Sequence, residues 1–378
     1  MGAPASGATR ELGQARFFPA RLRDRAASAL RRSAPLYRPA PPSDLALGYA
    51  AGNVPGTALL IAMLAGTANC SQGPTALATA VLTRNSRHEP LFTPWVLSAV
   101  EEADPELAAG LAVLLWDYED EGLQAMLMRQ AGLLVGVAGD DTLASLDALR
   151  RKHSPNLRFH RHGHKVSFAA IGYPAEGNHG DMATLAAMDS ILWDQNGCLS
   201  ARVHFVEGDA AAYAEALGAS LREMAAEIPR GATPRRLVHR AFDTYAALEG
   251  DGNVRLFSAY DDDFAVALDR RHWDAGAIQR AVNVCQGRVV VVRPVDDLDS
   301  VSGYLGQLPA ANLQSMSVSI EPERLLGLAE RVGACGVTAL RPLGRAAFPQ
   351  LAYSWDGLLP LDAGWLRPPG HFTTVEPA

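Results

Sequence analysis

Short, uninterrupted apolar segments alternate with amphipathic helical patterns along the chain from residue 44 onward. Residues 111–115 have the sequence LAVLL, and residues 133–138 have the sequence LLVGVA. Continuous apolar runs of this length are typical of parallel strands that are buried on both faces. Because helices must then cover both faces of the sheet, the alternation predicts an α/β fold.

Other segments extend the same pattern. Strands are predicted at residues 166–171, 202–206 and 288–295, and helices at residues 92–109 and 143–151. Between the first two of these strands, apolar residues recur at three- and four-residue spacing, which puts them on one face of a further helix. These residues are Met182, Leu185, Met188, Ile191 and Leu192.

Length, charge and cysteine content narrow the class of protein. The chain has 378 residues, more than one compact core usually holds, so two domains are expected. Its formal net charge of −7 argues against a nucleic-acid binder, which needs a basic surface. The most apolar run, residues 57–65, is far shorter than the roughly 20 residues that span a bilayer, so no stable membrane insertion is expected. The four cysteines form no CxxC pair, which fits a reducing, cytoplasmic location.

Residues 1–43 are expected to form a basic leader outside the folded part. Eight arginines lie within the first 40 residues, against Glu11 and Asp24. No apolar segment follows these arginines, so the leader is not predicted to be a signal peptide. A solvated, partly helical segment is favoured; the alternative is that the arginines dock on an acidic carrier or on the phosphates of a ligand.

Cys198 follows a predicted helix that ends at residues 194–197, and the strand at 202–206 comes directly after it. The cysteine is therefore expected in a tight turn between a helix and a strand. A thiolate held in such a turn is a candidate nucleophile. The alternative is an inert buried cysteine, which is the usual state of an isolated Cys. Three others are expected to be packing residues: Cys70, Cys285 and Cys335.

A second candidate site lies between the strand at 133–138 and the helix at 143–151. The connecting residues are Gly139, Asp140, Asp141 and Thr142, which offer a glycine and helix-capping side chains. A strand, a glycine-containing turn and a helix N-terminus together form an anion-binding arrangement. The segment lacks a full GxGxxG pattern.

Four segments, in this order, carry a family resemblance: GNVPG at 52–56, NSRHEPLF at 85–92, GHKVSF at 163–168 and DQNGCLS at 194–200. Together they resemble the fatty-acyl reductase of bacterial luminescence and its relatives, the LuxC-type acyl-CoA reductases of the aldehyde dehydrogenase superfamily. Weaker agreement continues to about residue 360, through three short segments. These are residues 288–297, 312–315 and 342–345.

The resemblance implies an α/β, aldehyde dehydrogenase-like fold. A Rossmann-like nicotinamide-binding domain would occupy residues 44–165, with part of residues 346–378 packing back on it. A catalytic α/β domain carrying Cys198 would occupy residues 166–345. The active site would then lie between the two domains, with the cysteine facing the nicotinamide.

The same resemblance implies roles for individual residues. Cys198 would be the nucleophile, and its backbone N–H and the Asn53 side chain would bind the oxyanion of the intermediate. Asn53 as a simple turn residue is the alternative. His164 is a candidate proton donor to the leaving group. It alternates with His160 and His162, but no carboxylate or cysteine accompanies them, so no metal site is predicted.

Aldehyde-oxidising members of the superfamily carry a glutamate that activates water to hydrolyse the acyl-enzyme. The corresponding residues 161–165 are RHGHK, without a glutamate. An enzyme that must keep its thioester until hydride arrives has no use for such a base. The absence therefore favours an acyl reductase over a hydrolytic dehydrogenase.

The resemblance also implies a nicotinamide cofactor. Arg84 stands where the wider superfamily has a lysine on the adenosine ribose, and a guanidinium suits a 2′-phosphate. NADPH is therefore predicted, with NADH as the alternative. The residues expected at the cofactor are Arg84, Ser86, Gly139, Asp140, Thr142 and Gly163.

The predicted function is reduction of an acyl thioester to an aldehyde through an acyl-enzyme on Cys198. The substrate would be acyl-CoA or an acyl carrier protein, and a homo-oligomer is compatible with the sequence. Two alternatives remain: a cofactor-independent acyltransferase or thioesterase that uses the same cysteine, and a non-catalytic relative that binds a carrier protein.

Overall fold

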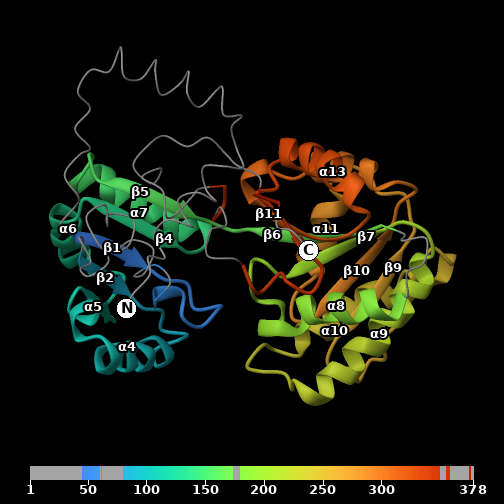
Figure 1. Ribbon diagram of the computed structural model, residues 1–378, viewed down its shortest axis with the longest axis horizontal. Coiled ribbons are helices and arrows are strands. Elements are labelled where there is room, and N and C mark those ends of the chain that lie inside the picture. Colours follow the sequence, from blue (N-terminus) through green and yellow to red (C-terminus); the bar gives the residue numbers. More distant parts are fainter. Residues whose placement is uncertain are drawn as a thin grey trace, which may run out of the picture. The chain divides into compact units, whose positions relative to one another are not determined.

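The computed structural model describes residues 45–59, 61, 80–172, 179–349, 355–357 and 374–375 (Figure 1). The basic leader and Cys70 lie outside these residues. The described strands form two sheets, and the chain passes from the first to the second between His162 and Val166. Both sheets are covered by helices, as the apolar runs predicted.

The first sheet has five parallel strands in the order β3-β2-β1-β4-β5. The chain moves outward from β1 through β2 to β3, then returns to β4 on the other side of β1. In open α/β sheets, ligands bind at such a switch point, outside the carboxyl ends of the strands. The strands are β1 (Leu45–Tyr49), β2 (Ala80–Arg84), β3 (Leu111–Leu114), β4 (Leu133–Val137) and β5 (Arg158–His162).

Both faces of the first sheet are buried because successive side chains of each strand point to opposite sides. On β1, Ala46 belongs to one apolar cluster and Leu47 to the other. The first cluster also contains Trp355, so the described part of the C-terminal segment packs against this sheet. The helices of this half are α4 (Phe92–Ala103), α5 (Pro105–Ala109), α6 (Glu121–Gln130) and α7 (Asp140–His153).

The single helix predicted at 92–109 was wrong, because two helices occupy this stretch. Asp104 leaves the helical conformation, with φ −149° and ψ 86°, and its side chain accepts the Leu107 N–H at 3.0 Å. Pro105 occupies the first turn of the new helix, where its missing N–H costs nothing. Asp104 therefore ends helix α4, and together with Pro105 it begins helix α5.

The second sheet has eight strands in the order β13-β12-β11-β6-β7-β10-β9-β8, all parallel except the β8–β9 pair. The strands predicted at 166–171, 202–206 and 288–295 are confirmed to within one residue at each end. The strands are β6 (Val166–Ile171), β7 (Ala201–Val206), β8 (Val254–Leu256), β9 (Ala265–Asp269), β10 (Val289–Pro294), β11 (Leu313–Ser319), β12 (Ala339–Pro342) and β13 (Thr374–Val375).

Helices cover the two faces of the second sheet. Helices α8 (His179–Ile191) and α9 (Ala210–Glu227) pack on one face, and α11 (Ala277–Val284) and α13 (Pro322–Cys335) lie on the other (Figure 1). The remaining helices of the second face contribute to the same core cluster as α11 and α13, and Cys285 is buried within it. These remaining helices are α10 (Arg236–Ala246) and α12 (Val301–Leu305).

The predicted apolar face of α8 is only partly correct. Met182 and Ile191 are buried, but Leu185 is 48% exposed and lies over Gly344. The side chains that α8 buries in the core beside α9 include small ones, which allow close approach of the two helices. They are Ala183, Ala186 and Ala187.

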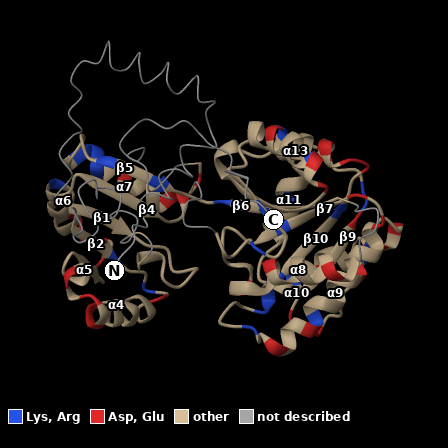
Figure 2. Cartoon of the chain, viewed as in Figure 1, with Lys and Arg blue, Asp and Glu red and all other residues tan. Residues whose placement is uncertain are grey.

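The outer helices carry charges of both signs, and helices α9 and α13 show acidic and basic side chains interspersed (Figure 2). Helix α7 has Asp140 and Asp141 in its first turn and four basic residues in its last turn, an arrangement that complements the helix dipole. None of the described helices is both long enough and apolar enough to cross a membrane.

Two helical glycines test how tightly the helices pack. A Cβ added at Gly218 in α9 would overlap the backbone carbonyl oxygen of Phe257, whereas one added at Gly303 in α12 would meet nothing within 4 Å. We expect Gly218→Ala to lower the free energy of unfolding by about 1–3 kcal/mol. Gly303→Ala should raise it by about 0.4–1 kcal/mol. Urea denaturation checks both, and a stabilising Gly218→Ala would contradict the packing.

Candidate active site

The turn that presents Cys198 is strained. The residues between α8 and β7 include a short 3₁₀ segment, η1 (Leu192–Gln195), in which Trp193, Asp194 and Gln195 have φ values of 57°, 50° and 58°. Three consecutive non-glycine residues in the left-handed region cost about 1–2 kcal/mol each. Such strain persists only where surrounding contacts enforce it. The predicted turn between a helix and a strand is confirmed. The left-handed backbone conformation of its three residues was not predicted from the sequence.

Gln195 holds the turn through its side-chain amide. Its Nε2 donates to the backbone carbonyls of Ala201 at 2.9 Å and Val289 at 2.8 Å, and its Oε1 accepts the Val289 N–H at 2.9 Å. Gln195 is 1% exposed, so these hydrogen bonds are shielded from water. One side chain therefore ties the turn to the start of β7 and the start of β10.

Asp194 holds the same turn through a buried ion pair. The guanidinium of Arg288 lies 2.7 Å from Asp194 Oδ1 and also donates to the carbonyls of Ile228 and Pro229. Asp194 Oδ2 accepts the Gly231 N–H at 3.0 Å. The turn is thereby fastened to the loop that follows α9. Breaking one partner of a buried pair is costly because it leaves an uncompensated charge.

Cys198 itself is anchored through its carbonyl. The Ser167 hydroxyl donates to the Cys198 carbonyl oxygen at 2.7 Å and lies 2.9 Å from the Ser315 hydroxyl. Ser167 belongs to β6 and Ser315 to β11. The segments 163–168 and 312–315, which carried the family resemblance, therefore meet at the cysteine.

Asn53 also reaches this turn. Its Nδ2 donates to the backbone carbonyl of Asn196 at 2.8 Å. A Cβ on Gly197 would lie 3.8 Å from Val54, so the segment 52–56 packs beside the nucleophile turn. The structure thus brings Asn53 and Cys198 together, with the Asn53 amide bonded to a protein carbonyl.

The environment of the Cys198 thiol disfavours the thiolate. Burial, and next the negative charge of Asp356, raise the pKa of the thiol to about 11, although the residue keeps some exposure. A hydrogen bond from Gln314, the backbone of Cys198 and the charge of Arg341 act in the opposite direction. The thiol is therefore protonated at neutral pH in this state.

A buried polar group adjoins the cysteine. His162 Nδ1 lies 2.8 Å from Asp356 Oδ2, and Gln314 Nε2 donates to Asp356 Oδ1 at 2.7 Å. The His162 ring stacks on Trp355, with ring centroids 4.0 Å apart. Burial alone would raise the pKa of Asp356, but His162, Lys165 and Gln314 hold that pKa below its usual value. Asp356 is therefore a buried carboxylate anion.

His164 lies beside the first sheet. Its backbone N–H donates to Asp140 Oδ1 at 3.1 Å and its carbonyl accepts from Asn312. Partial burial, and next the charge of Arg202, lower the pKa of its imidazole, while Asp140 opposes them. No hydrogen bond between His164 and Cys198 occurs among the described residues, so its role as a proton donor stays a prediction.

The residues predicted at the cofactor lie at one edge of the first sheet. Arg84 ends β2 and Ser86 follows it, Gly163 follows β5, and residues 139–142 follow β4 beside the switch point. Helix α7 begins at Asp140 without a side-chain cap on its first N–H groups. Its first turn carries the carboxylates of Asp140 and Asp141, which oppose an anion.

Arg84 has partners within the protein. Its Nε donates to the Trp116 carbonyl at 3.1 Å, and its guanidinium lies 5.5 Å from the centre of the Tyr118 ring. Burial, and next the charge of Arg87, lower its pKa. Tyr118 in turn donates its hydroxyl to the Thr142 carbonyl at 3.1 Å. Arg84 and Thr142 are therefore linked through Tyr118 at this edge.

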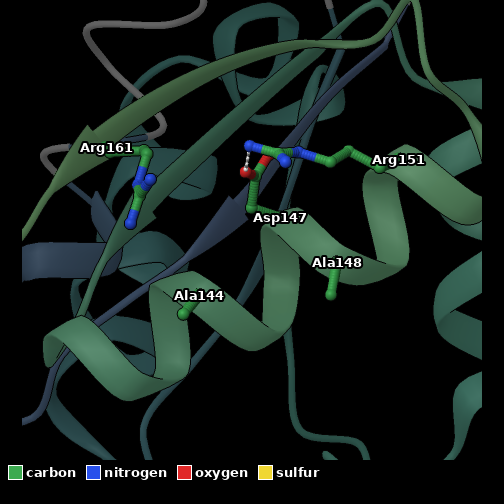
Figure 3. A pocket seen from close by; sticks show the side chains of 5 residues that line it. All are labelled: Ala144, Asp147, Ala148, Arg151 and Arg161. Carbon is green, nitrogen blue, oxygen red and sulfur yellow. Dashed lines mark ion pairs between the residues drawn. The ribbon is translucent and has the colours of Figure 1, made fainter.

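A separate surface pocket lies on helix α7 and strand β5 (Figure 3). None of the predicted site residues lines it. Its Arg151 is paired with Asp147 at 2.7 Å, and its lining includes two alanines. Within the described residues, no group of His, Cys, Asp or Glu could hold a metal ion. The pocket lining is Ala144, Asp147, Ala148, Arg151 and Arg161.

Sequence patterns did not identify several residues of the site. Asp194 and Gln195 lie within a segment that carried the resemblance, but nothing local reveals their partners. Ser167 and Gln314 also lie in such segments. Asp356 follows a tryptophan far along the chain, and no pattern near it pointed to Cys198.

The ion pair at the turn generates a stability prediction. Arg288→Met should lower the free energy of unfolding by about 3–5 kcal/mol, because Asp194 stays buried without its partner. The control is Arg222→Met, which breaks the Arg222–Asp262 pair at 2.6 Å, where the arginine side chain is 54% exposed. That change should cost at most about 1 kcal/mol. Urea denaturation compares them; equal losses would show that the buried pair does not hold the turn.

Comparison with solved structures shows the same fold in aldehyde dehydrogenases. The Δ-pyrroline-5-carboxylate dehydrogenase of Mycobacterium tuberculosis matches with a TM-score of 0.57 and 13% identity, over 85% of this chain and 62% of that one. Lactaldehyde dehydrogenase of Escherichia coli matches with a TM-score of 0.58 and 15% identity, over 87% and 70%. The predicted aldehyde dehydrogenase-like fold is confirmed. The chain spans less than two thirds of the first of these structures.

A third match is the NADP-dependent glyceraldehyde-3-phosphate dehydrogenase of Bacillus halodurans, with a TM-score of 0.55 and 13% identity, over 80% of this chain and 61% of that one. No sequence among functionally curated proteins matches the chain. The family model described as acyl-CoA reductase (LuxC) matches residues 21–363. This match includes the nucleophile turn and every segment that meets at it. The chain therefore belongs to the acyl-CoA reductase (LuxC) family, a family of oxidoreductases.

Proposed function

We propose that this protein reduces an acyl thioester, carried on CoA or on an acyl carrier protein, to an aldehyde through an acyl-enzyme on Cys198. The observation that carries the proposal is the strained turn, which is clamped on both sides and presents one cysteine where three segments of the chain meet. Strain of this kind clusters at functional sites. A cysteine that only packed the core would not require it.

The acylation step follows from the residues around the thiol. Once Cys198 has lost its proton, its sulfur adds to the thioester carbonyl carbon, and the carbonyl π electrons move to oxygen. The carbonyl then re-forms, and the leaving thiolate departs with the electron pair of its bond and takes up the proton that Cys198 released. The donors to the oxyanion would be the Cys198 backbone N–H and Asn53 Nδ2. Asn53 Nδ2 donates one hydrogen to the Asn196 carbonyl and has a second hydrogen for the oxyanion.

The residues of the first sheet fit a nicotinamide dinucleotide. The N–H groups at the uncapped start of α7 and the Arg84 guanidinium provide donors at the switch point. Structures of two matched dehydrogenases are described with NAD and with NADP. When bound, the reduced cofactor supplies the hydride that converts the acyl group to an aldehyde. Cys198 then leaves as a thiolate with the electron pair of the carbon–sulfur bond.

Residues 161–165 hold no carboxylate at the position of the missing glutamate. In residues 161–165, His162 is bonded to Asp356 and Lys165 donates to the Ala311 carbonyl. The acyl-enzyme should therefore persist until hydride arrives. This supports reduction over hydrolysis.

The acyl-enzyme is the first test. Protein mixed with radiolabelled acyl-CoA should retain label on Cys198 after excess substrate is removed, because the glutamate that activates water is absent there. Adding NADPH should release the label as aldehyde. Cys198→Ala should not be labelled, whereas Cys335→Ala, which removes another partly exposed cysteine, should behave as wild type.

The fate of the label separates the candidate functions. Release as free fatty acid at the same rate with and without NADPH would identify a thioesterase. Transfer to an added acceptor without cofactor would identify an acyltransferase. A wild type that is never labelled would point to a non-catalytic binding protein. Any of these results contradicts the proposal.

The cofactor preference rests on Arg84. If its guanidinium meets the 2′-phosphate, Arg84→Met should weaken NADPH binding by about 10- to 100-fold, the effect of losing hydrogen bonds to a charged group. NADH binding should change much less. The matched control is Arg87→Met, which removes a neighbouring exposed arginine that pairs with Asp117. Fluorescence titration gives the dissociation constants, and an equal loss for both cofactors would remove the argument for NADPH.

A further inference from the structure

The turn that presents Cys198 also carries an exposed aromatic side chain. Trp193 is 48% exposed, whereas the next two residues of the turn, Asp194 and Gln195, are buried. Its φ of 57° lies in the left-handed region, which is a rare conformation for a bulky aromatic residue. The turn therefore carries conformational strain and also leaves part of an indole in water. Neither core packing nor a local backbone preference explains a tryptophan at this position.

The backbone around Trp193 is fixed by its neighbours. The Trp193 carbonyl accepts the Asn196 N–H at 2.9 Å and Asn196 Nδ2 at 3.0 Å. Asp194 and Gln195, which follow the tryptophan, are held by the Arg288 ion pair and by hydrogen bonds to β7 and β10. These contacts set the place from which the indole projects.

The indole lies beside the segment 52–56. A Cβ added at Gly197 would lie 3.9 Å from Trp193 Cδ1 and 3.8 Å from Val54 Cγ2. Both side chains therefore pack at the residue that precedes Cys198. Val54 is itself partly exposed. Trp193 and Val54 thus form one apolar surface at the nucleophile turn.

The apolar surface continues onto the first turn of α4. A Cβ added at Gly56 would lie 3.2 Å from Phe92 Cε1, and the centroids of the Phe92 and Trp95 rings are 6.3 Å apart. Phe92 is 43% exposed and Trp95 is 71% exposed. Single exposed apolar residues are normal, but a continuous run of them marks an interaction site. The apolar strip consists of Trp193, Val54, Phe92 and Trp95.

The strip begins next to the oxyanion donors of the proposed function. Asn53, whose amide reaches the nucleophile turn, directly precedes Val54. If the acyl oxygen is bound by this amide and by the Cys198 N–H, the rest of the acyl group starts beside the same two residues. An alkyl chain that extends along the strip removes apolar surface from water on both partners, which favours its binding.

We propose that the apolar strip binds the aliphatic chain of the acyl group joined to Cys198, and that Trp193 is the residue that sets the preference for that chain. The identity of the chain rests on the proposed function. The order of the residues gives the order of the contacts. The first carbons of the chain meet Trp193 and Val54, and only a longer chain reaches Trp95.

The test measures how fast Cys198 in the full chain adds to N-ethyl-, N-hexyl- and N-decylmaleimide. The thiolate sulfur bonds to one alkene carbon and the other carbon takes up a proton, so the three reagents differ only in the alkyl chain. Mass spectrometry separates the Cys198 peptide from that of Cys335, a partly exposed cysteine that gives the background dependence on chain length. Cys198 should react about 10- to 100-fold faster with the decyl than with the ethyl reagent, because buried CH₂ groups favour binding. A series as flat as that of Cys335 overturns the proposal.

The role of Trp193 is tested by Trp193→Gly. Glycine favours a φ of 57°, so this variant should fold. Loss of the indole should lower the ratio of the decyl rate to the ethyl rate by about 10-fold, and Trp193→Phe, which keeps an apolar ring, should retain most of that ratio. A merely structural turn residue would change the rates of all three reagents by the same factor. An unchanged ratio therefore overturns the proposal.

The matched control is Leu326→Ala. Leu326 is a 69% exposed apolar residue on α13, which covers the other face of the second sheet from α8. This variant should keep the wild-type ratio of decyl to ethyl rates. A fall as large as that of Trp193→Gly would attribute the chain-length preference to exposed apolar surface in general, and would overturn the proposal.

The order of the contacts is tested by Trp95→Ala. This change should lower the decyl-to-ethyl ratio by about 3- to 10-fold and leave the hexyl-to-ethyl ratio as in wild type, because only the longer chain reaches α4. Equal losses for hexyl and decyl overturn the order. If the strip instead joins two copies of the chain, wild type sediments as a dimer that Trp95→Ala dissociates, and the maleimide series is flat. That result overturns the proposal as a whole.

The maleimide rates use neither acyl-CoA nor cofactor, so they stand apart from the proposed function. Labelling of wild type by radiolabelled acyl-CoA tests the function on its own. Wild type that is not labelled, with a steep maleimide series, contradicts the proposed function and leaves the affinity of the strip for alkyl chains established. Wild type that is labelled, with an unchanged ratio in Trp193→Gly, contradicts only the role of the strip.

Discussion

The buried contact between Asp194 and Arg288 is the interaction on which the site depends. Three consecutive residues before the cysteine adopt left-handed backbone conformations, which neither Trp193 nor Gln195 favours. The ion pair, together with the Gln195 amide, offsets that cost by joining the turn to β7, β10 and the loop after α9. Rigid strands thus fix a short and unfavourable turn, and Cys198 is displayed at a fixed place between them.

The parallel topology explains why so many segments reach this turn. Carboxyl ends of parallel strands lie at one edge of a sheet, so the loops after β1, β2, β4 and β5 lie together. Asn53 comes from the first of these loops and contacts the nucleophile turn. From the second sheet, Ser167 on β6 and Ser315 on β11 anchor the Cys198 carbonyl. Each contact is made by a residue far from the cysteine in sequence.

Sequence patterns predicted the strands best, because strands buried on both faces require continuous apolar runs that few other structures tolerate. The helices were less well predicted. The segment 92–109 has a helical composition throughout, but a cap at Asp104 followed by a proline divides it. On α8, Leu185 looked like a core residue, yet alanines pack toward α9 because close helix approach favours small side chains. The spacing of apolar residues predicts which side of a helix faces the core. The element that packs against the helix decides which residues of that side are buried.

By itself the sequence determined the α/β class, the position of Cys198 between a helix and a strand, and the segments that resemble acyl-CoA reductases. These features depend on local patterns of residues along the chain. Only the tertiary structure decided what surrounds the sulfur. Asp356 lies 158 positions after Cys198 in the sequence, and Gln314 lies 116 positions after it. Neither residue lies in a sequence pattern that indicates which residue it contacts. Their contacts arise because the folded chain buries a carboxylate, and a buried carboxylate must find donors wherever the packing places them.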